Sequence, residues 1–290
     1  MGEANRMGRR EVLAAAVLLV VGVLVLATVA QPAGAVFPGR NGKIAFNKYS
    51  PRDDDFRIYT VEPGGTGQSM LGEGPGYSPS WSADGETVAF ERTTQHGPDT
   101  FSVDIFVMNA DSGDVRQITS GTADDYNPAF SPDGETIAFV REPFGTGTDL
   151  FMIKLDGTAL TQFTNTPTMD EGSLAFSPSG DKVVFSRAGS RNSDVFVVNS
   201  DGTETENLTK MRRIDEYHPD WSPDAQKITF TSYPFGRPGG EQENADISVM
   251  NAADGTERKD LTDGLRRLAC ILPRRDQDRF LQNNLLQDQG

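Results

Sequence analysis

The sequence predicts an all-β fold, a β-propeller of four-stranded blades, and two observations lead to that prediction. The phrase NPAFSPDGETIAF at 127–139 recurs with small changes as SPSWSADGETVAF, SLAFSPSGDKVVF and HPDWSPDAQKITF. Its proline position holds Pro79, Pro128, Leu174 and Pro219, which are 49, 46 and 45 residues apart. A repeat of about 20 to 50 residues indicates a propeller, a solenoid or another array. Each unit also holds four short segments rich in β-branched and aromatic residues, separated by turn signals, as propeller blades do.

The expected strands follow the same order in every unit. The first strand begins the phrase, and the second is its apolar end, at 88–90, 137–140, 183–185 and 228–231. The third strand is expected at 57–61, 104–108, 149–153, 194–198 and 246–250. The fourth ends in a Leu-Thr-like pair at 118–119, 163–164, 208–209 and 261–262. The predicted blade units lie near 41–74, 77–123, 125–169, 171–214 and 216–264 within a propeller region of 36–264.

The first unit is incomplete. Lys43–Phe46 matches the second half of the phrase, and no PAFS-like segment precedes it. We therefore expect four complete blades plus partial ones, with the innermost strand missing from the first blade. A ring of this kind leaves strand edges and apolar side chains exposed.

The connections between strands differ in kind. Strands one and two are joined by tight turns at Asp84-Gly85, Asp133-Gly134 and Ser179-Gly180, where glycine tolerates a positive φ. Strands two and three are joined by dissimilar loops, such as REPFGTG from Arg141 and ERTTQHGPDTFS from Glu91. We define the loop face as the end of the blades with these loops and the lead-ins to strand one. Variable loops on a rigid scaffold are where binding usually occurs, so a binding surface is expected on the loop face.

The N-terminal residues 1–35 predict an export signal. Three arginines up to Arg10 precede the uncharged apolar run 12–30, which is followed by the small residues Ala33-Gly34-Ala35. This layout is typical of a cleavable signal, with cleavage expected after Ala35. The run is also long enough for an uncleaved membrane anchor, which stays open as the alternative. Either reading places the protein in the periplasm, in the cell envelope or outside the cell.

The amino-acid composition argues against some classes of binding partner. Acidic residues outnumber basic residues by 42 to 27, which gives a net charge of −15. Such a surface repels phosphate backbones and anionic lipids, so nucleic acid is not an expected partner. Membrane contact is expected only through the N-terminal segment, if it is uncleaved.

The tail 265–290 breaks the repeat pattern. It contains Cys270, the only cysteine of the chain, and it stands where the next PAFS-like phrase is due. Read one base later, the codons of this stretch are compatible with PAFSPDGT, then Lys or Arg, then IAF. The proline of that phrase would fall near position 269, about one repeat after Pro219. We therefore expect the tail to be an out-of-frame reading, from either a frameshift or a sequencing error.

Phrases such as SPDGETIAF followed by DLFMIKLDG resemble the TolB-type, WD-like propeller repeat, over roughly 41–264. This resemblance implies an exported propeller, typically six-bladed in TolB, which acts as a protein-binding hub of the Tol–Pal envelope system. No separate N-terminal α/β domain is visible, which favours a stand-alone secreted relative. The ring is then incomplete as translated.

Six residues are the candidate binding site on the loop face. Three of them are tyrosines that stand two residues before the proline of the repeated phrase: Tyr77, Tyr126 and Tyr217. The other three are their neighbours Asp125, Glu216 and His218. Aromatic and acidic groups around a channel suit a peptide or a basic protein partner. Tyrosines that pack between neighbouring blades are the alternative. The aspartates that begin strand three are expected to serve the repeat itself, by bonding local backbone: Asp104, Asp149, Asp194 and Asp246.

The sequence favours a non-enzymatic scaffold that binds a protein or peptide, with no cofactor and no metal. The two histidines, His96 and His218, fall in different blades, and no G-x-S-x-G nucleophile motif is present. One alternative is a propeller detached from a serine peptidase of the prolyl-oligopeptidase type. Another is a truncated product without function.

Overall fold

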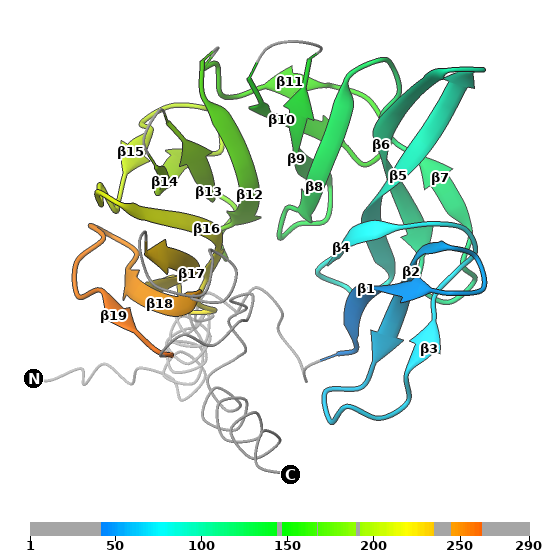
Figure 1. Cartoon of the computed structure of the whole chain (residues 1–290), viewed down its shortest axis with the longest axis horizontal. Coiled ribbons are helices and arrows are strands. Elements are labelled where there is room, and N and C mark those ends of the chain that lie inside the picture. Colours follow the sequence, from blue (N-terminus) through cyan, green and yellow to red (C-terminus); the bar gives the residue numbers. More distant parts are fainter. Residues whose placement is uncertain (1–41, 144–146, 167, 190–191, 235–244, 263–290) are drawn as a thin grey trace, which may run out of the picture. The chain divides into compact units, whose positions relative to one another are not determined.

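The computed structural model describes residues 42–143, 147–166, 168–189, 192–234 and 245–262, and this part of the chain is all β (Figure 1). Its strands form five antiparallel sheets, one per blade. The first blade has three strands, β1 (Ile44–Ser50), β2 (Asp55–Val61) and β3 (Ser69–Met70). The second and third contain β4 (Tyr77–Trp81), β5 (Thr87–Gly97), β6 (Thr100–Asn109), β7 (Val115–Gln117), β8 (Asp124–Phe130), β9 (Thr136–Glu142), β10 (Asp149–Lys154) and β11 (Thr161–Gln162). The fourth and fifth contain β12 (Asp170–Phe176), β13 (Lys182–Ala188), β14 (Ser193–Asn199), β15 (Glu206–Asn207), β16 (Ile214–Trp221), β17 (Lys227–Pro234), β18 (Asp246–Asn251) and β19 (Lys259–Asp260).

This architecture confirms the predicted fold class: four complete four-stranded blades and one partial blade. In each complete blade the strands pair in chain order, for example β4-β5-β6-β7. We call the first strand of a complete blade its inner strand; these are β4, β8, β12 and β16. Each inner strand contacts the inner strand of the next blade. The first blade begins with β1, the counterpart of β5, so within the described ranges it has no inner strand, as predicted.

The turns between strands one and two follow the serine and glycine pattern of the phrase. Ser131 Oγ donates to the Asp133 carboxylate at 2.5 Å and accepts from the Thr136 N–H at 3.0 Å. Gly134 then has a φ of +73°, the left-handed conformation that the Asp-Gly turn predicts. The fifth blade places Ala225 at the same turn position, where its φ is +57°. The tightness of the turn therefore does not depend on glycine being present.

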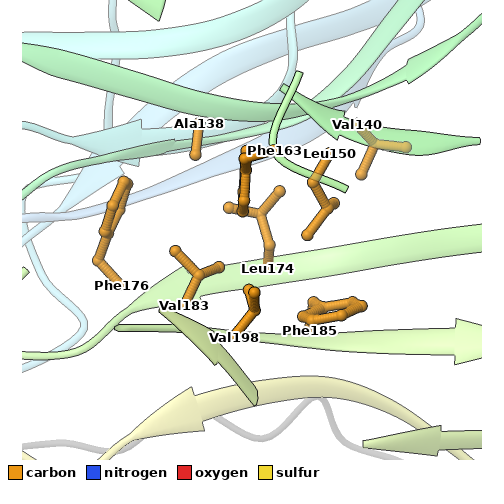
Figure 2. Packing of buried hydrophobic residues seen from close by; sticks show 9 residues of the cluster. All are labelled: Ala138, Val140, Leu150, Phe163, Leu174, Phe176, Val183, Phe185 and Val198. Carbon is orange, nitrogen blue, oxygen red and sulfur yellow. The ribbon is translucent and has the colours of Figure 1, made fainter. Parts of the chain in front are cut away.

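Apolar side chains from neighbouring blades interlock to form the core. Figure 2 shows one such layer, in which side chains of the third blade face side chains of the fourth. Phe185 is fully buried in this layer, and its counterparts in the other complete blades are fully buried too: Phe90, Phe139 and Phe230. At about 1.5–3 kcal/mol per buried side chain, these layers are the main stabilising contribution between blades.

The aspartates that begin strand three serve the repeat, as predicted, although their partners are mostly side chains. Gln117 donates to Asp104 at 3.1 Å, and Gln162 donates to Asp149 at 3.0 Å. Asn207 donates to Asp194 in the same way at 2.9 Å. These bonds tie strand four to strand three in each of these blades. Asp149 also accepts from the Thr166 backbone N–H at 2.7 Å.

One predicted loop is wrong. The segment after Glu91 continues as strand, so that β5 and β6 form a hairpin closed near Gly97, with Gln95 opposite Phe101. Threonine, phenylalanine and valine favour the extended conformation of a strand. These residues continue the pairing of β5 with β6 beyond the four-stranded part of the blade. The signal 1–35 and the tail 265–290 lie outside the described residues.

Candidate functional site

The register of the sheets shows which connections share an end of the blades. Tyr77 pairs with Glu91, next to the β5–β6 extension, and Asp124 pairs with Glu142 at the end of β9. The lead-ins to the inner strands therefore share the loop face with the strand-two-to-three connections. The opposite turns bond to each other, as the Ala110 N–H does to the Glu86 carbonyl at 2.8 Å.

Every inner strand is bulged at its loop-face end. The pairing shifts register directly after Tyr77, Gly172 and Tyr217, and after Tyr126 as well. Three of the residues that follow have left-handed backbones, with φ of +47° at Ser78, +51° at Asn127 and +53° at His218. A bulge re-aims the neighbouring side chains and bends the strand. It thereby orients the tyrosine that precedes it.

The three predicted tyrosines are half-buried and occupy equivalent positions. Tyr77 donates to Asp55 at 2.5 Å, and its ring lies 5.5 Å from that of Phe56 on the first blade. It therefore packs between blades, as the alternative interpretation holds. Tyr126 donates to Asp124 of its own strand at 3.1 Å. Burial, followed by the negative charge of Asp124, raises the pKa of Tyr126 well above its ordinary value, so the phenol stays a hydrogen-bond donor.

Tyr217 and His218 form a separate aromatic group on the fifth blade. The Tyr217 ring lies 5.8 Å from that of Tyr233 and 6.3 Å from that of His218. Burial lowers the pKa of His218, and its Nδ1 atom has no hydrogen-bond partner within the described residues. The intervening inner strand β12 carries Gly172 at the tyrosine position. The aromatic groups are thus interrupted at the fourth blade.

The two predicted acids are not available to a ligand. Asp125 and Glu216 are completely buried, whereas the sequence suggested that they line an open rim. Arg141 donates to both Asp125 oxygens, at 2.7 and 2.8 Å, and Arg258 pairs with Glu216. Burial raises the pKa of both carboxyls, and the paired arginines oppose that shift. The reason is the strand period, because a residue next to the tyrosine must point to the opposite face of the sheet.

These ion pairs belong to a repeated arrangement that we call the arginine clamp. An arginine two residues after the buried phenylalanine lies over two aromatic rings and bonds an acid of the inner strand. Arg187 lies 5.0 Å from the Phe185 ring and 4.6 Å from the Phe196 ring, and donates to Glu171 at 2.6 and 2.9 Å. Sequence reasoning missed the clamp. Its signal was the recurrence of arginine at that spacing.

The clamp varies at the ends of the repeat array. In the second blade Gly76 takes the acid position, and Arg92 donates to the carbonyls of Pro75 at 2.8 Å and Glu73 at 2.9 Å. In the fifth blade Ser232 takes the arginine position, and Arg258 reaches over the Phe230 ring, at 5.1 Å, from the start of strand four. The guanidinium site is thus filled from a different strand.

One histidine–serine contact needs comparison with a catalytic arrangement. His96 Nε2 lies 2.6 Å from Ser102 Oγ, and Ser102 donates to Asp104 at 3.0 Å. In a nucleophilic triad the carboxylate holds the histidine, whereas here it holds the serine. Ser102 is 2% exposed, so its oxygen does not reach a substrate. This chain of contacts stabilises the β5–β6 extension.

The described ranges hold neither a metal-binding cluster nor a membrane-spanning helix. No group of three or more His, Cys, Asp or Glu side chains there is arranged to hold a metal ion. The same residues contain no helix long and apolar enough to cross a membrane.

Comparisons with known proteins agree with the architecture. Residues 35–173 match the family model of the TolB β-propeller domain. Curated proteins gave no match. The structure of a putative TolB from Agrobacterium tumefaciens is 19% identical with a TM-score of 0.62, and the alignment covers 76% of this chain and 80% of that one.

Two other solved structures share the fold. A chain of the nidogen/laminin complex is 13% identical with a TM-score of 0.60, over 77% of this chain and 79% of that one. A puromycin-hydrolyzing peptidase from Mycobacterium tuberculosis is 13% identical with a TM-score of 0.55, over 79% of this chain and 38% of that one. The matched segment is thus similar to the TolB β-propeller domain, and the chain shares the propeller fold of these solved structures.

Proposed function

We propose that the protein is a non-enzymatic, exported scaffold that binds a protein or peptide at its loop face. The observation that carries this proposal is the β5–β6 hairpin, which extends the second blade and leaves the Phe101 side chain 56% exposed. An aromatic side chain held on a rigid hairpin is a typical anchor in protein interfaces. The TolB resemblance and the fold shared with a chain of the nidogen/laminin complex support a protein partner.

The contact surface that we propose combines Phe101 with the half-buried Tyr126, Tyr217 and His218. Asp125 and Glu216 support this surface from below, because they hold Arg141 and Arg258 in place. Tyr77 contributes mainly to packing between the first two blades. The partner therefore meets aromatic rings and hydrogen-bonding groups rather than free carboxylates.

A capture experiment tests this surface. Proteins from the periplasm or the culture medium would be captured by the wild-type chain and by a Phe101→Ser variant. Leu160→Ser is the matched control, because Leu160 is 46% exposed in the turn between β10 and β11, at the opposite end of the blade. A partner that is lost with Phe101→Ser and kept with Leu160→Ser supports the proposal. Equal capture by all three proteins contradicts it.

A detached propeller of a prolyl-oligopeptidase-type serine peptidase is the second candidate. The observation in its favour is the shared fold with the puromycin-hydrolyzing peptidase, of which this chain matches 38%. The DNA downstream of the propeller separates the two candidates. An α/β-hydrolase segment with a G-x-S-x-G motif favours the peptidase, and a stop codon shortly after a final blade favours the scaffold.

Export and the origin of the tail are further parts of the proposal. Mass spectrometry of the secreted or periplasmic protein is expected to find a mature N-terminus at Val36. Resequencing across codons 262 to 282 tests the tail. Codons that cannot encode PAFSPDG in the second frame exclude a frameshift, and a truncated product without function then loses its basis.

A further inference from the structure

In the part of the chain that the structure describes, the first blade has a free strand edge where the other blades carry an inner strand. Strands β5, β9, β13 and β17 each pair with an inner strand on one side, whereas among the described residues β1 pairs only with β2. The consequence shows at Ile44, which is 45% exposed. Its counterparts in the complete blades are fully buried: Val88, Ile137, Val183 and Ile228. A free edge next to uncovered apolar surface is a template for an added strand.

The same edge carries half of an arginine clamp. Lys48 stands two residues after Phe46, as Arg141 does after Phe139, and its Nζ lies 5.5 Å from the Tyr59 ring centre. The Lys48 side chain is exposed and has no ion-pair partner among the described residues. In the complete third blade the equivalent cation is paired with Asp125 of the inner strand. The first blade thus presents the cation without its acid.

The register of the complete blades predicts which side chains a strand bound at this edge must carry. Asp125 of β8 lies opposite Arg141, and Phe130 lies opposite Ile137. Transferred to the first blade, these pairs place a carboxylate opposite Lys48 and an aromatic ring over Ile44. The two contacts lie at opposite ends of β1, so they fix both the direction and the register of the added strand.

The nearest unassigned stretch of this chain does not meet those requirements. Residues 265–272, LRRLACIL, begin five residues after β19 ends and hold two arginines and no carboxylate. An arginine near Lys48 adds repulsion, and the stretch holds no aromatic ring for Ile44. This stretch is therefore not the expected occupant of the edge.

We propose that the free edge of β1 binds an extended segment of a partner polypeptide, antiparallel to β1, with a carboxylate at Lys48 and an aromatic side chain at Ile44. Backbone hydrogen bonds along β1 supply sequence-independent affinity, and the two side-chain contacts supply selectivity. This surface goes beyond the loop-face function, because it does not use Phe101 or the tyrosine positions. Failure of one proposal leaves the other standing.

A synthetic peptide tests the inference with the full chain. The capped peptide DDYNPAFS has the sequence of Asp124–Ser131 and carries both required side chains. Its affinity would be measured by calorimetry for the wild type, for Lys48→Glu and for the control Lys43→Glu, which changes an exposed lysine just outside β1. We expect Lys48→Glu to bind about tenfold more weakly, since an attraction becomes a repulsion, and Lys43→Glu to match the wild type.

A charge swap makes the assignment specific. A peptide with lysine at its second position, DKYNPAFS, is expected to bind Lys48→Glu better than it binds the wild type, and a peptide with alanine in place of its phenylalanine is expected to bind the wild type more weakly. The proposal is overturned if no peptide binds at millimolar concentration, or if the Lys48→Glu and Lys43→Glu variants behave alike. It is also overturned if sedimentation shows that a second copy of the chain covers the edge and excludes the peptide.

Discussion

The arginine clamp of the fourth blade gives the sharpest test of what holds a blade together. Replacing Arg187 by methionine removes the cation and keeps a side chain of similar length between Phe185 and Phe196. Methionine packs well against aromatic rings, so the main change is the loss of charge next to Glu171. Glu171 has a fully buried side chain and would be left with an uncompensated negative charge.

The size of the effect follows from the contacts that Glu171 keeps. Breaking a buried ion pair from one side costs about 3–5 kcal/mol. Glu171 still accepts from the Leu150 N–H at 3.1 Å and from Thr166 Oγ1 at 3.1 Å, and from Thr164 as well. These donors place the expected loss at the lower end, about 3 kcal/mol. For a domain of this size that corresponds to a fall in Tm of about 6 to 12 °C.

The assay is thermal unfolding by calorimetry or circular dichroism, with Lys227→Met as the matched control. The Lys227 and Glu257 side chains are 40% and 71% exposed, so their ion pair contributes at most about 1 kcal/mol. Adding Glu171→Gln to Arg187→Met should recover part of the loss, because it neutralises the stranded charge. The reasoning fails if the two methionine variants lose equal stability, or if Glu171→Gln deepens the defect.

Four further substitutions test the turns and one buried acid. Ala225→Gly should stabilise the protein by about 0.5–1 kcal/mol, because the left-handed backbone no longer strains a side chain. Gly134→Ala, with open space around its Cβ position, should destabilise the protein by a similar amount. Tm values equal to that of the wild type would contradict both expectations. Gly202→Ala should cost more than Gly134→Ala in the same melting assay, since its Cβ would lie 2.7 Å from the Phe163 carbonyl oxygen of the preceding blade. Burial raises the pKa of Glu91, so the folded protein loses stability as the pH rises from the ordinary carboxyl pKa through the raised value. The Glu91→Gln variant should therefore melt above the wild type at pH 7 and lose that advantage near pH 4. A difference in Tm that stays constant with pH would refute this reasoning.

The repeat made most of the fold predictable, because each blade obeys the same local rules. The strands alternate in period two, and the glycine of the Asp-Gly turn reports a positive φ directly. The three strands that the structure describes in the first blade agree with the sequence, where no PAFS-like segment stands directly before Lys43. The β5–β6 extension was not predictable in the same way, since it interrupts the repeat with polar residues that read equally well as a loop.

The candidate site was harder to predict, because burial depends on contacts across the sheet. Asp125 and Tyr126 are neighbours in sequence but point to opposite faces of the sheet, so one is buried and the other partly open. Arg258 was not predictable from the sequence either. It fills the position that Ser232 leaves vacant, and no spacing rule connects residues 26 positions apart on different strands.

Lys48 differs from the clamp positions of the second and fifth blades, where another group completes the arginine clamp. Where Ser232 replaces the clamp arginine, Arg258 supplies the cation, and where Gly76 replaces the acid, backbone carbonyls receive Arg92. At Lys48 no described group completes the clamp. A lysine at an open edge also hinders pairing between identical edges, because two copies that join along β1 bring two ammonium groups into one interface. The side chain that we expect to attract an acidic strand is therefore the same one that opposes self-association, and both effects should disappear together in a Lys48→Ala variant.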